Sequence, residues 1–104
     1  AEDIPVCIAG MDDQEEFCDV IIDYKRIALD FGKLEKELLS VAKGLVGQHP
    51  DIGAIVLECT DMSYFAPLIQ QTVKLPVFDI ITLTNMVHQA VVRRPFVGMV
   101  DRNA

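Results

Sequence analysis

The residues best suited to chemistry are Cys59, Thr60 and Asp61, which stand in succession after a continuously apolar segment. A helix is expected soon after them, so the thiol and hydroxyl lie at a helix N-terminus. Unpaired backbone N–H groups there favour an anion such as a carboxylate. The helix dipole also raises the thiolate fraction of a cysteine. A thiolate can accept a proton or attack a carbonyl, so Cys59 is a candidate catalytic residue.

Cys59 also has a plainer interpretation, because a free cysteine often packs in a core as a small apolar residue. Position alone does not choose between the two. The other cysteines, Cys7 and Cys18, share no Cys-x-x-Cys motif with it, and no His and Cys cluster has metal-ligand spacing. We therefore expect no disulfide framework, no metal and a reducing, cytoplasmic location.

The elements that position these residues follow from apolar periodicity and end signals. Short β-rich apolar runs predict strands, whereas apolar residues at three- and four-residue spacing predict helices. Asp30 can cap the longest helix, Ser63 can cap the next, and Asp79 can cap the last or orient a cleft. The strands are expected at Ile4–Ala9, Ile52–Leu57 and Leu75–Asp79, and the helices at about Asp13–Ile22, Ala28–Gly47, Tyr64–Val73 and Ile80–Arg93.

Strands that alternate with helices predict an α/β fold with a parallel sheet. Sites in such sheets lie beyond the carboxyl ends of the strands, which here are residues 10–13, 59–63 and 79–82. Three strands are few for a sheet, and their apolar edges need a cover. We expect missing chain, another domain or a second copy to complete the sheet.

Composition excludes several functions. The 104 residues hold 9 Lys and Arg against 16 Asp and Glu, a formal net charge of −7. Such a surface repels phosphate backbones and anionic lipid, so nucleic-acid and peripheral membrane roles are disfavoured. The wholly apolar runs are only a few residues long, far below the about 20 that a membrane-spanning helix needs. No signal peptide is recognisable, because the first apolar stretch is short and follows acidic residues.

Two segments together resemble a known family. Residues 52–62 end in Glu-Cys-Thr-Asp-Met, and residues 75–80 read Leu-Pro-Val-Phe-Asp-Ile. They are similar to the C-terminal region of the aspartate/glutamate racemase superfamily, which includes hydantoin racemase. The resemblance implies two flavodoxin-like domains facing a cleft, each with one cysteine, and no metal or cofactor. It makes Cys59 the acid/base residue and places Thr60, Asp61 and Met62 at the substrate, with Thr60 holding its carboxylate.

The departures from that family limit the expected activity. The family's N-terminal domain with its own cysteine is absent, and neither Cys7 nor Cys18 lies in a motif that replaces it. One thiol cannot perform a two-base inversion, so we expect this chain to be inactive by itself. We predict one α/β domain over residues 1–104, half of the two-domain racemase fold and the C-terminal region of a longer protein.

The expected partners are a small carboxylate or amino-acid-like ligand, and either a second copy or the missing N-terminal domain. The alternative is a non-catalytic α/β interaction module that oligomerises through its incomplete sheet. A thiol-transfer role for Cys59 is the weakest hypothesis, because no resolving cysteine lies two residues away.

Overall fold

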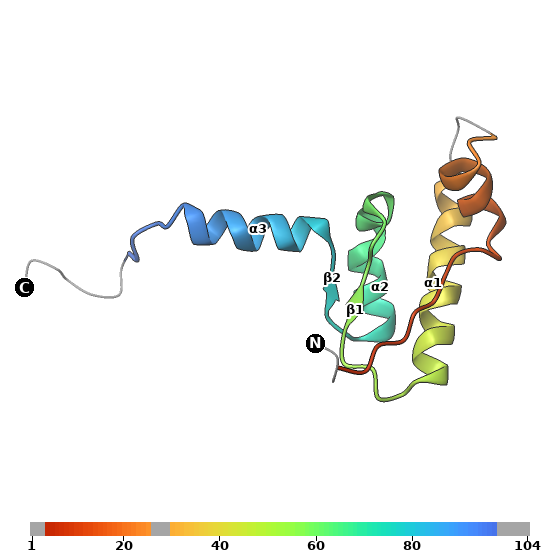
Figure 1. Ribbon diagram of the computed structural model, residues 1–104, viewed down its shortest axis with the longest axis horizontal. Coiled ribbons are helices and arrows are strands. Elements are labelled where there is room, and N and C mark those ends of the chain that lie inside the picture. Colours follow the sequence, from red (N-terminus) through yellow and green to blue (C-terminus); the bar gives the residue numbers. More distant parts are fainter. Residues whose placement is uncertain (1–3, 26–29, 98–104) are drawn as a thin grey trace, which may run out of the picture.

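The computed structural model describes residues 4–25 and 30–97. It is a mixed α/β structure in which two short parallel strands lie among helices (Figure 1). In chain order the elements are a π-helix η1 (Phe17–Ile22), α1 (Phe31–Gln48), β1 (Ile55–Val56), a 3₁₀-helix η2 (Thr60–Phe65), α2 (Ala66–Val73), β2 (Val77–Phe78) and α3 (Ile80–Val91).

Helix α1 begins at Phe31, directly after its N-cap residue Asp30. The Asp30 carboxylate accepts a 3.0 Å hydrogen bond from the Lys33 backbone N–H, which satisfies a donor of the first turn. The predicted cap is confirmed, and the helix ends at Gln48, one residue beyond the expected Gly47. The expected start at Ala28 lies outside the described residues.

Helix α1 also holds the segment before it through an unexpected contact. The Glu37 carboxylate accepts hydrogen bonds from the backbone N–H groups of Glu16 and Phe17, at 2.8 and 2.9 Å. These donors belong to the start of the helix expected at Asp13–Ile22, which is present as one turn running into η1. Glu37 is buried although its spacing suggests a solvent-facing position, because it satisfies the end of a neighbouring helix.

The sheet is smaller than expected. Ile55 pairs with Val77 and Val56 with Phe78, in parallel, and backbone hydrogen bonds from Ile55 to Pro76 and from Leu57 to Phe78 flank this register. The α/β class is confirmed, but the described residues form two strands rather than a flavodoxin-like sheet.

The predicted strand Ile4–Ala9 is wrong. Its residues are exposed and form no ladder, with Ile8 92% exposed. A strand requires a neighbour to receive its hydrogen bonds, and the described strands pair only with each other.

Helices α1 and α2 lie side by side and bury the core between them and the N-terminal segment (Figure 1). The buried cluster is Met11, Phe17, Leu34, Leu38, Ala42, Phe65 and Ile69. Pro67 lies in the first turn of α2, where its missing N–H removes no intrahelical hydrogen bond.

Residues 60–65 form the 3₁₀-helix η2 rather than the start of the predicted helix at Tyr64. Ser63 does not cap that helix, because its hydroxyl is buried within η2 with no hydrogen-bond partner among the described residues. The N-cap of α2 is Phe65, which supplies no side-chain cap.

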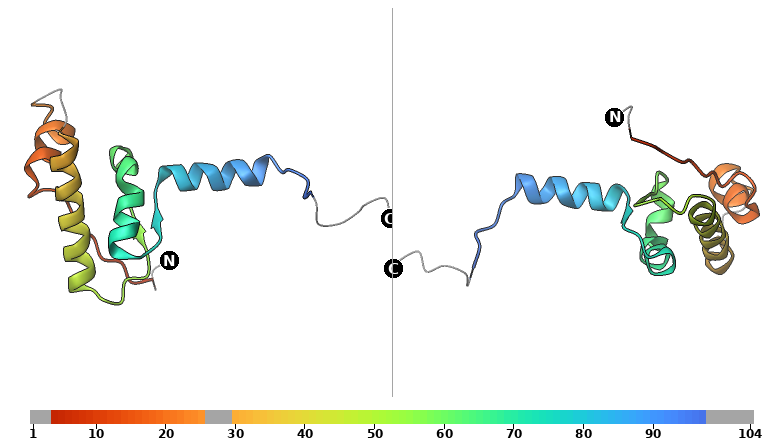
Figure 2. Two further views of the ribbon diagram at one scale, coloured as in Figure 1. Left: turned by 180° about the vertical axis from the view of Figure 1, so that it is seen from behind. Right: turned by 90° about the horizontal axis from the view of Figure 1, so that it is seen from below.

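Helix α3 extends away from the rest of the molecule (Figures 1 and 2). It has no buried residue, and the molecule measures 63 × 36 × 26 Å. Its start is well defined nonetheless. The Asp79 carboxylate accepts from the Thr82 N–H, and the Thr82 hydroxyl lies 3.0 Å from the Asp79 backbone N–H, which forms a capping box. The capping role that we expect for Asp79 is confirmed.

No helix within residues 4–25 and 30–97 is long and apolar enough to cross a membrane.

Candidate functional site

The candidate site is a mainly apolar cavity of about 260 Å³ that contains Cys59. Its walls come from the N-terminal segment 8–11, from η1 and α1, and from the chain that leaves β1 and enters η2. Met11, Phe17 and Leu38 contribute buried apolar surface. Two of the predicted strand-end segments, residues 10–13 and 59–63, therefore meet at one cavity although no strand leads to the first of them.

Cys59 is the N-cap residue of η2 and lies partly buried against the core. Its backbone carbonyl accepts a hydrogen bond from the Met62 N–H at 3.1 Å, which closes the first turn. The thiol donates to the Asp61 carboxylate over 3.8 Å, a long contact that is within reach for sulfur. The sulfur is thus held at a helix start and beside a cavity, within hydrogen-bonding reach of a carboxylate.

The four residues predicted for the site do not all line the cavity. Cys59 and Met62 line it, whereas Thr60 and Asp61 are exposed and lie outside its wall. Asp61 still contacts Cys59 through the thiol. Their predicted roles at a substrate stay predictions.

The position of η2 is set by aromatic packing at the start of α1. The ring of Phe31 lies 5.6 Å from Tyr64 and 6.2 Å from Phe65, and the last two meet edge to face at 5.2 Å. Such pairs add specific geometry to apolar burial. Phe65 is in the core and Tyr64 is exposed, so these rings support the site from outside rather than wall it.

The other two cysteines are separate from the cavity. Cys7 is exposed on the N-terminal segment. The Cys18 thiol donates to the carbonyls of Met11 and Asp12, at 3.5 and 3.3 Å. Burial raises the pKa of the Cys18 thiol, and the nearby carboxylate of Asp23 raises it further. Cys18 is therefore held as a protonated hydrogen-bond donor away from the cavity, whereas Cys59 lines the cavity.

Glu58 is the charged residue of the cavity wall, and Phe17 is a site residue that the sequence analysis did not single out. The signal for Gly10 and Met11 was the expected turn after the first apolar run. The contribution of Phe17 depends on how η1 packs, which periodicity does not reveal. Among the described residues that line this cavity no side chain is cationic.

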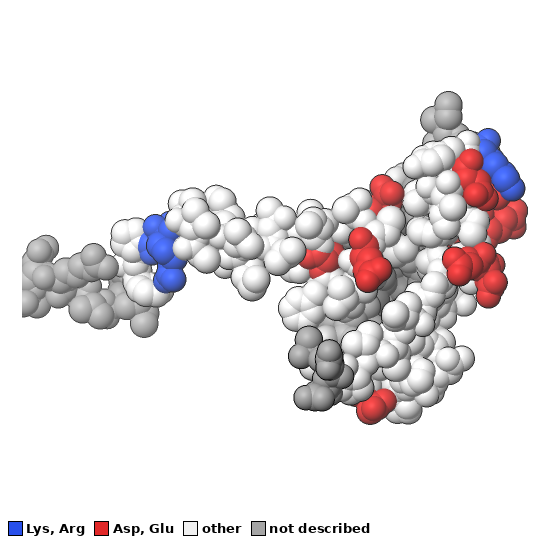
Figure 3. Space-filling model, viewed as in Figure 1, with Lys and Arg blue, Asp and Glu red and all other residues white. Residues whose placement is uncertain are grey.

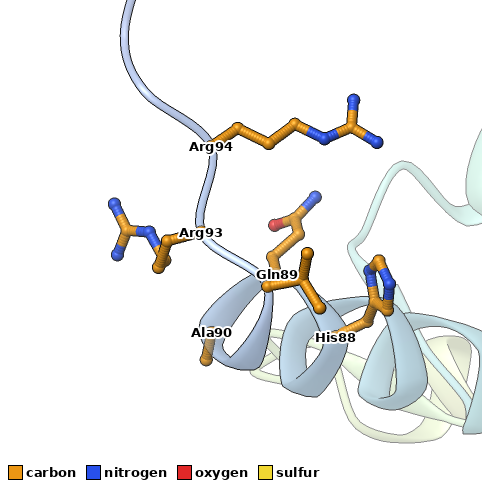
Figure 4. A pocket seen from close by; sticks show the side chains of 6 residues that line it. His88, Gln89, Ala90, Arg93 and Arg94 are labelled. Atoms are coloured by element: carbon orange, nitrogen blue, oxygen red, sulfur yellow. The ribbon is translucent and has the colours of Figure 1, made fainter.

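Further depressions lie outside this cavity, and two of them adjoin α3. One, of about 460 Å³, lies between the sheet and α3 and is lined by Glu58, Asp79 and apolar side chains that include Leu83. The other is an open hollow at the far end of α3, beside His88, Arg93 and Arg94 (Figure 4). Across the described ranges, no group of three or more His, Cys, Asp or Glu is placed to hold a metal ion.

Comparison with known proteins gives two relatives. The chain is 30% identical over 92 residues to dimethylsulfoniopropionate lyase 5 of Emiliania huxleyi (strain CCMP1516), which covers 88% of this chain and 18% of that protein. It is 33% identical over 73 residues to the dimethylsulfoniopropionate lyase of Durusdinium sp. clade D, which covers 70% of this chain and 24% of that protein. The chain thus spans about a fifth to a quarter of the length of these relatives.

No protein-family model matches the chain, and no solved structure matches it either. These findings overturn the resemblance to the aspartate/glutamate racemase superfamily. The relatives bear the name of a lyase, and no family model supports a racemase or isomerase. The functional interpretation as part of a racemase is wrong for the same reason. The alternative, a non-catalytic interaction module, receives no better support.

Proposed function

We propose that this chain is part of a lyase that acts on dimethylsulfoniopropionate and that Cys59 is the base of the reaction. The observation that carries the proposal is the similarity over 88% of the chain to a protein of that name. The matched length includes most of the chain, and the chain's own geometry offers one thiol at a cavity. The substrate is a small carboxylate, the class of ligand that the residue types at Cys59 and Thr60 favour.

The reaction follows from the structure of the substrate, which carries a dimethylsulfonium group two carbons from a carboxylate. The Cys59 thiolate removes a proton from the carbon next to the carboxylate. The electron pair forms a carbon–carbon double bond, and the carbon–sulfur bond breaks. Dimethyl sulfide leaves with that bonding pair, acrylate remains, and the thiol returns its proton to solvent. Charges and atoms balance without an oxidant or a second thiol.

An apolar cavity suits this reaction. The thiolate is negative and the sulfonium positive before the step, and both are neutral after it. Surroundings of low dielectric therefore stabilise the products and the transition state relative to separated ions in water. The walls from Met11, Phe17 and Leu38 provide such surroundings at Cys59. The Cys59 thiol donates a hydrogen bond to the Asp61 carboxylate, 3.8 Å away, which orients the sulfur.

We assign the substrate's carboxylate to the start of η2, outside the cavity wall, where Thr60 and Asp61 follow Cys59. The backbone N–H groups of Thr60 and Asp61 belong to its first turn, where intrahelical acceptors are lacking. The Thr60 hydroxyl is a further donor.

The test is release of dimethyl sulfide, measured by headspace gas chromatography with the purified chain and dimethylsulfoniopropionate. Cys59→Ser is expected to lower the rate about 100-fold or more, the usual effect of losing a general base. Cys7→Ser is the matched control, because Cys7 is an exposed thiol outside this cavity. It is expected to leave the rate unchanged.

A second measurement detects binding of the substrate even where its turnover is slow. The substrate is expected to protect Cys59, but not Cys7, from alkylation by iodoacetamide, as read by mass spectrometry. Equal release from Cys59→Ser and wild type would refute the role of Cys59. A folded wild-type chain that neither releases dimethyl sulfide nor shows this protection would refute the proposed function.

A further inference from the structure

The cavity at Cys59 has an acidic side chain in its wall. Among the described residues around it, Glu58 supplies the charge and the other side chains, which include Met11 and Phe17, are uncharged. Glu58 also borders the depression between the sheet and α3, so it lies where the two hollows adjoin. Because Glu58 is exposed, its carboxylate is at the rim of the cavity rather than in the core. A ligand in the cavity is therefore close to a negative charge.

The backbone on either side holds Glu58 at this rim. The Leu57 N–H donates a 2.8 Å hydrogen bond to the Phe78 carbonyl, which fixes the chain just beyond β1. Leu57 and Cys59 pack against the core, and Glu58 between them is exposed, as alternation along an extended chain requires. Within residues 4–25 and 30–97 the Glu58 carboxylate has no hydrogen-bond or ion-pair partner. It is thus available to a cationic group of a ligand.

The neighbouring carboxylates already have partners. Asp79, which borders the second depression, accepts the Thr82 N–H in the capping box of α3. Asp61 lies outside the cavity wall and accepts the hydrogen bond of the Cys59 thiol. On the face shown in Figure 3, acidic side chains lie on the body of the molecule, including the region where α3 begins, and basic side chains lie at its two ends. The charges of this region favour a cation at the cavity.

A sulfonium group suits this wall better than an ammonium group does. It has no N–H to donate, and its positive charge is spread over sulfur and the attached carbons. An ammonium group needs acceptors for its three hydrogens, which apolar side chains such as Met11 and Leu38 do not supply. Cations that carry methyl groups instead bind well against aromatic rings, and Phe17 places one in this wall.

We propose that Glu58 is the residue that selects the sulfonium group of the substrate, an inference that rests on the proposed function. The carboxylate binds the cation at the rim, and Met11 and Phe17 contact its methyl groups. Glu58 transfers no proton. Its attraction for the sulfonium disappears when the carbon–sulfur bond breaks, because dimethyl sulfide is neutral. Glu58 therefore strengthens substrate binding without lowering the barrier to the reaction, and it does not retain the product.

The first test is how Glu58→Gln divides its effect between KM and kcat in dimethyl sulfide release. KM is expected to rise about 5-fold, the upper range for an exposed ion pair, and kcat to stay within a factor of about 3. Glu58→Asp keeps the charge and should recover most of the binding. Asp51→Asn is the matched control, because Asp51 is an exposed carboxylate outside this cavity, and it should leave both constants unchanged. A fall in kcat of about 100-fold with KM unchanged would make Glu58 a proton-transfer residue and overturn the proposal.

The second test compares two ligands of the same shape. Isocaproate has the carboxylate and the branched end of the substrate, with an uncharged carbon in place of the sulfonium sulfur. In wild type, half-protection of Cys59 from iodoacetamide should need about 5-fold less dimethylsulfoniopropionate than isocaproate, in assays too short to consume the substrate. In Glu58→Gln the two concentrations should be about equal. Their ratio is independent of any change in the reactivity of the thiol itself, and an unchanged ratio in Glu58→Gln would overturn the proposal.

The trimethylsulfonium ion separates this inference from the proposed function, because it carries the cation and cannot undergo the elimination. It is expected to protect Cys59 in wild type and less well in Glu58→Gln. Such protection in a chain that releases no dimethyl sulfide would support the cation site and refute the reaction. Dimethyl sulfide release with the same KM in Glu58→Gln and wild type would overturn the role of Glu58 and leave the reaction standing. A wild-type chain in which trimethylsulfonium gives Cys59 no protection would also overturn that role.

Discussion

Replacing Glu37 by leucine tests the contact that holds the N-terminal wall of the cavity to α1. The carboxylate accepts two backbone hydrogen bonds, 2.8 and 2.9 Å long, from Glu16 and Phe17, which are both buried. Hydrogen bonds to a charged group contribute about 1.5–3 kcal/mol each, and leucine leaves both donors without that acceptor. The upper sum is about 6 kcal/mol, but the short helix can open to water, so we expect a loss of about 3 kcal/mol.

Urea denaturation followed by circular dichroism measures this loss. The slope of the unfolding free energy against urea concentration should be the same for the variant and wild type. Glu37→Gln keeps one acceptor oxygen and should lose about half as much. Glu35→Gln removes the same charge from the same helix at a partly exposed position and should stay within about 0.5 kcal/mol of wild type. A Glu37→Leu protein as stable as wild type would show that the two hydrogen bonds do not hold this wall.

Two further predictions concern Cys18 and Asp79. Because burial and nearby carboxylates raise the Cys18 pKa, its alkylation in the folded protein should require a higher pH than in urea, as peptide mass spectrometry would report. The raised pKa also means that this thiol favours the folded state at low pH and loses that contribution as pH rises through the folded value. Coincident pH profiles would contradict the cause given. Asp79→Ala removes the capping box and should cost α3 about 1 kcal/mol locally. It should lower helix content in circular dichroism without an equal loss of global stability, because the helix buries no residue, and Thr84→Ala is the control.

The local features of this fold were predictable from sequence because their causes are local. Asp30 and Asp79 cap α1 and α3 through backbone groups three residues away, so spacing alone identifies them. The parallel strand pair was recognised by its apolar runs, and its extent was overestimated because residues at the ends of those runs have no ladder partner.

Features that depend on contacts between distant residues were predicted poorly. The run at Ile4–Ala9 has the composition of a strand, but it forms no hydrogen-bonded ladder with β1 or β2. Glu37 has the spacing of a surface residue, yet it is buried by the helix end that it satisfies. The predicted membership of the racemase superfamily was also wrong, because a short motif around Cys59 does not specify which reaction the surrounding protein performs.

The sequence by itself determined the caps of α1 and α3, the acidic character of the chain, and that a thiol follows the best apolar run. Only the tertiary structure decided that this thiol faces a cavity, that Met11 and Phe17 close it, and that α3 stands free with an uncovered apolar side. The physical reason is that capping and periodicity act within a few residues. A cavity, a buried carboxylate and an uncovered face depend instead on which segments, distant in the sequence, pack against one another.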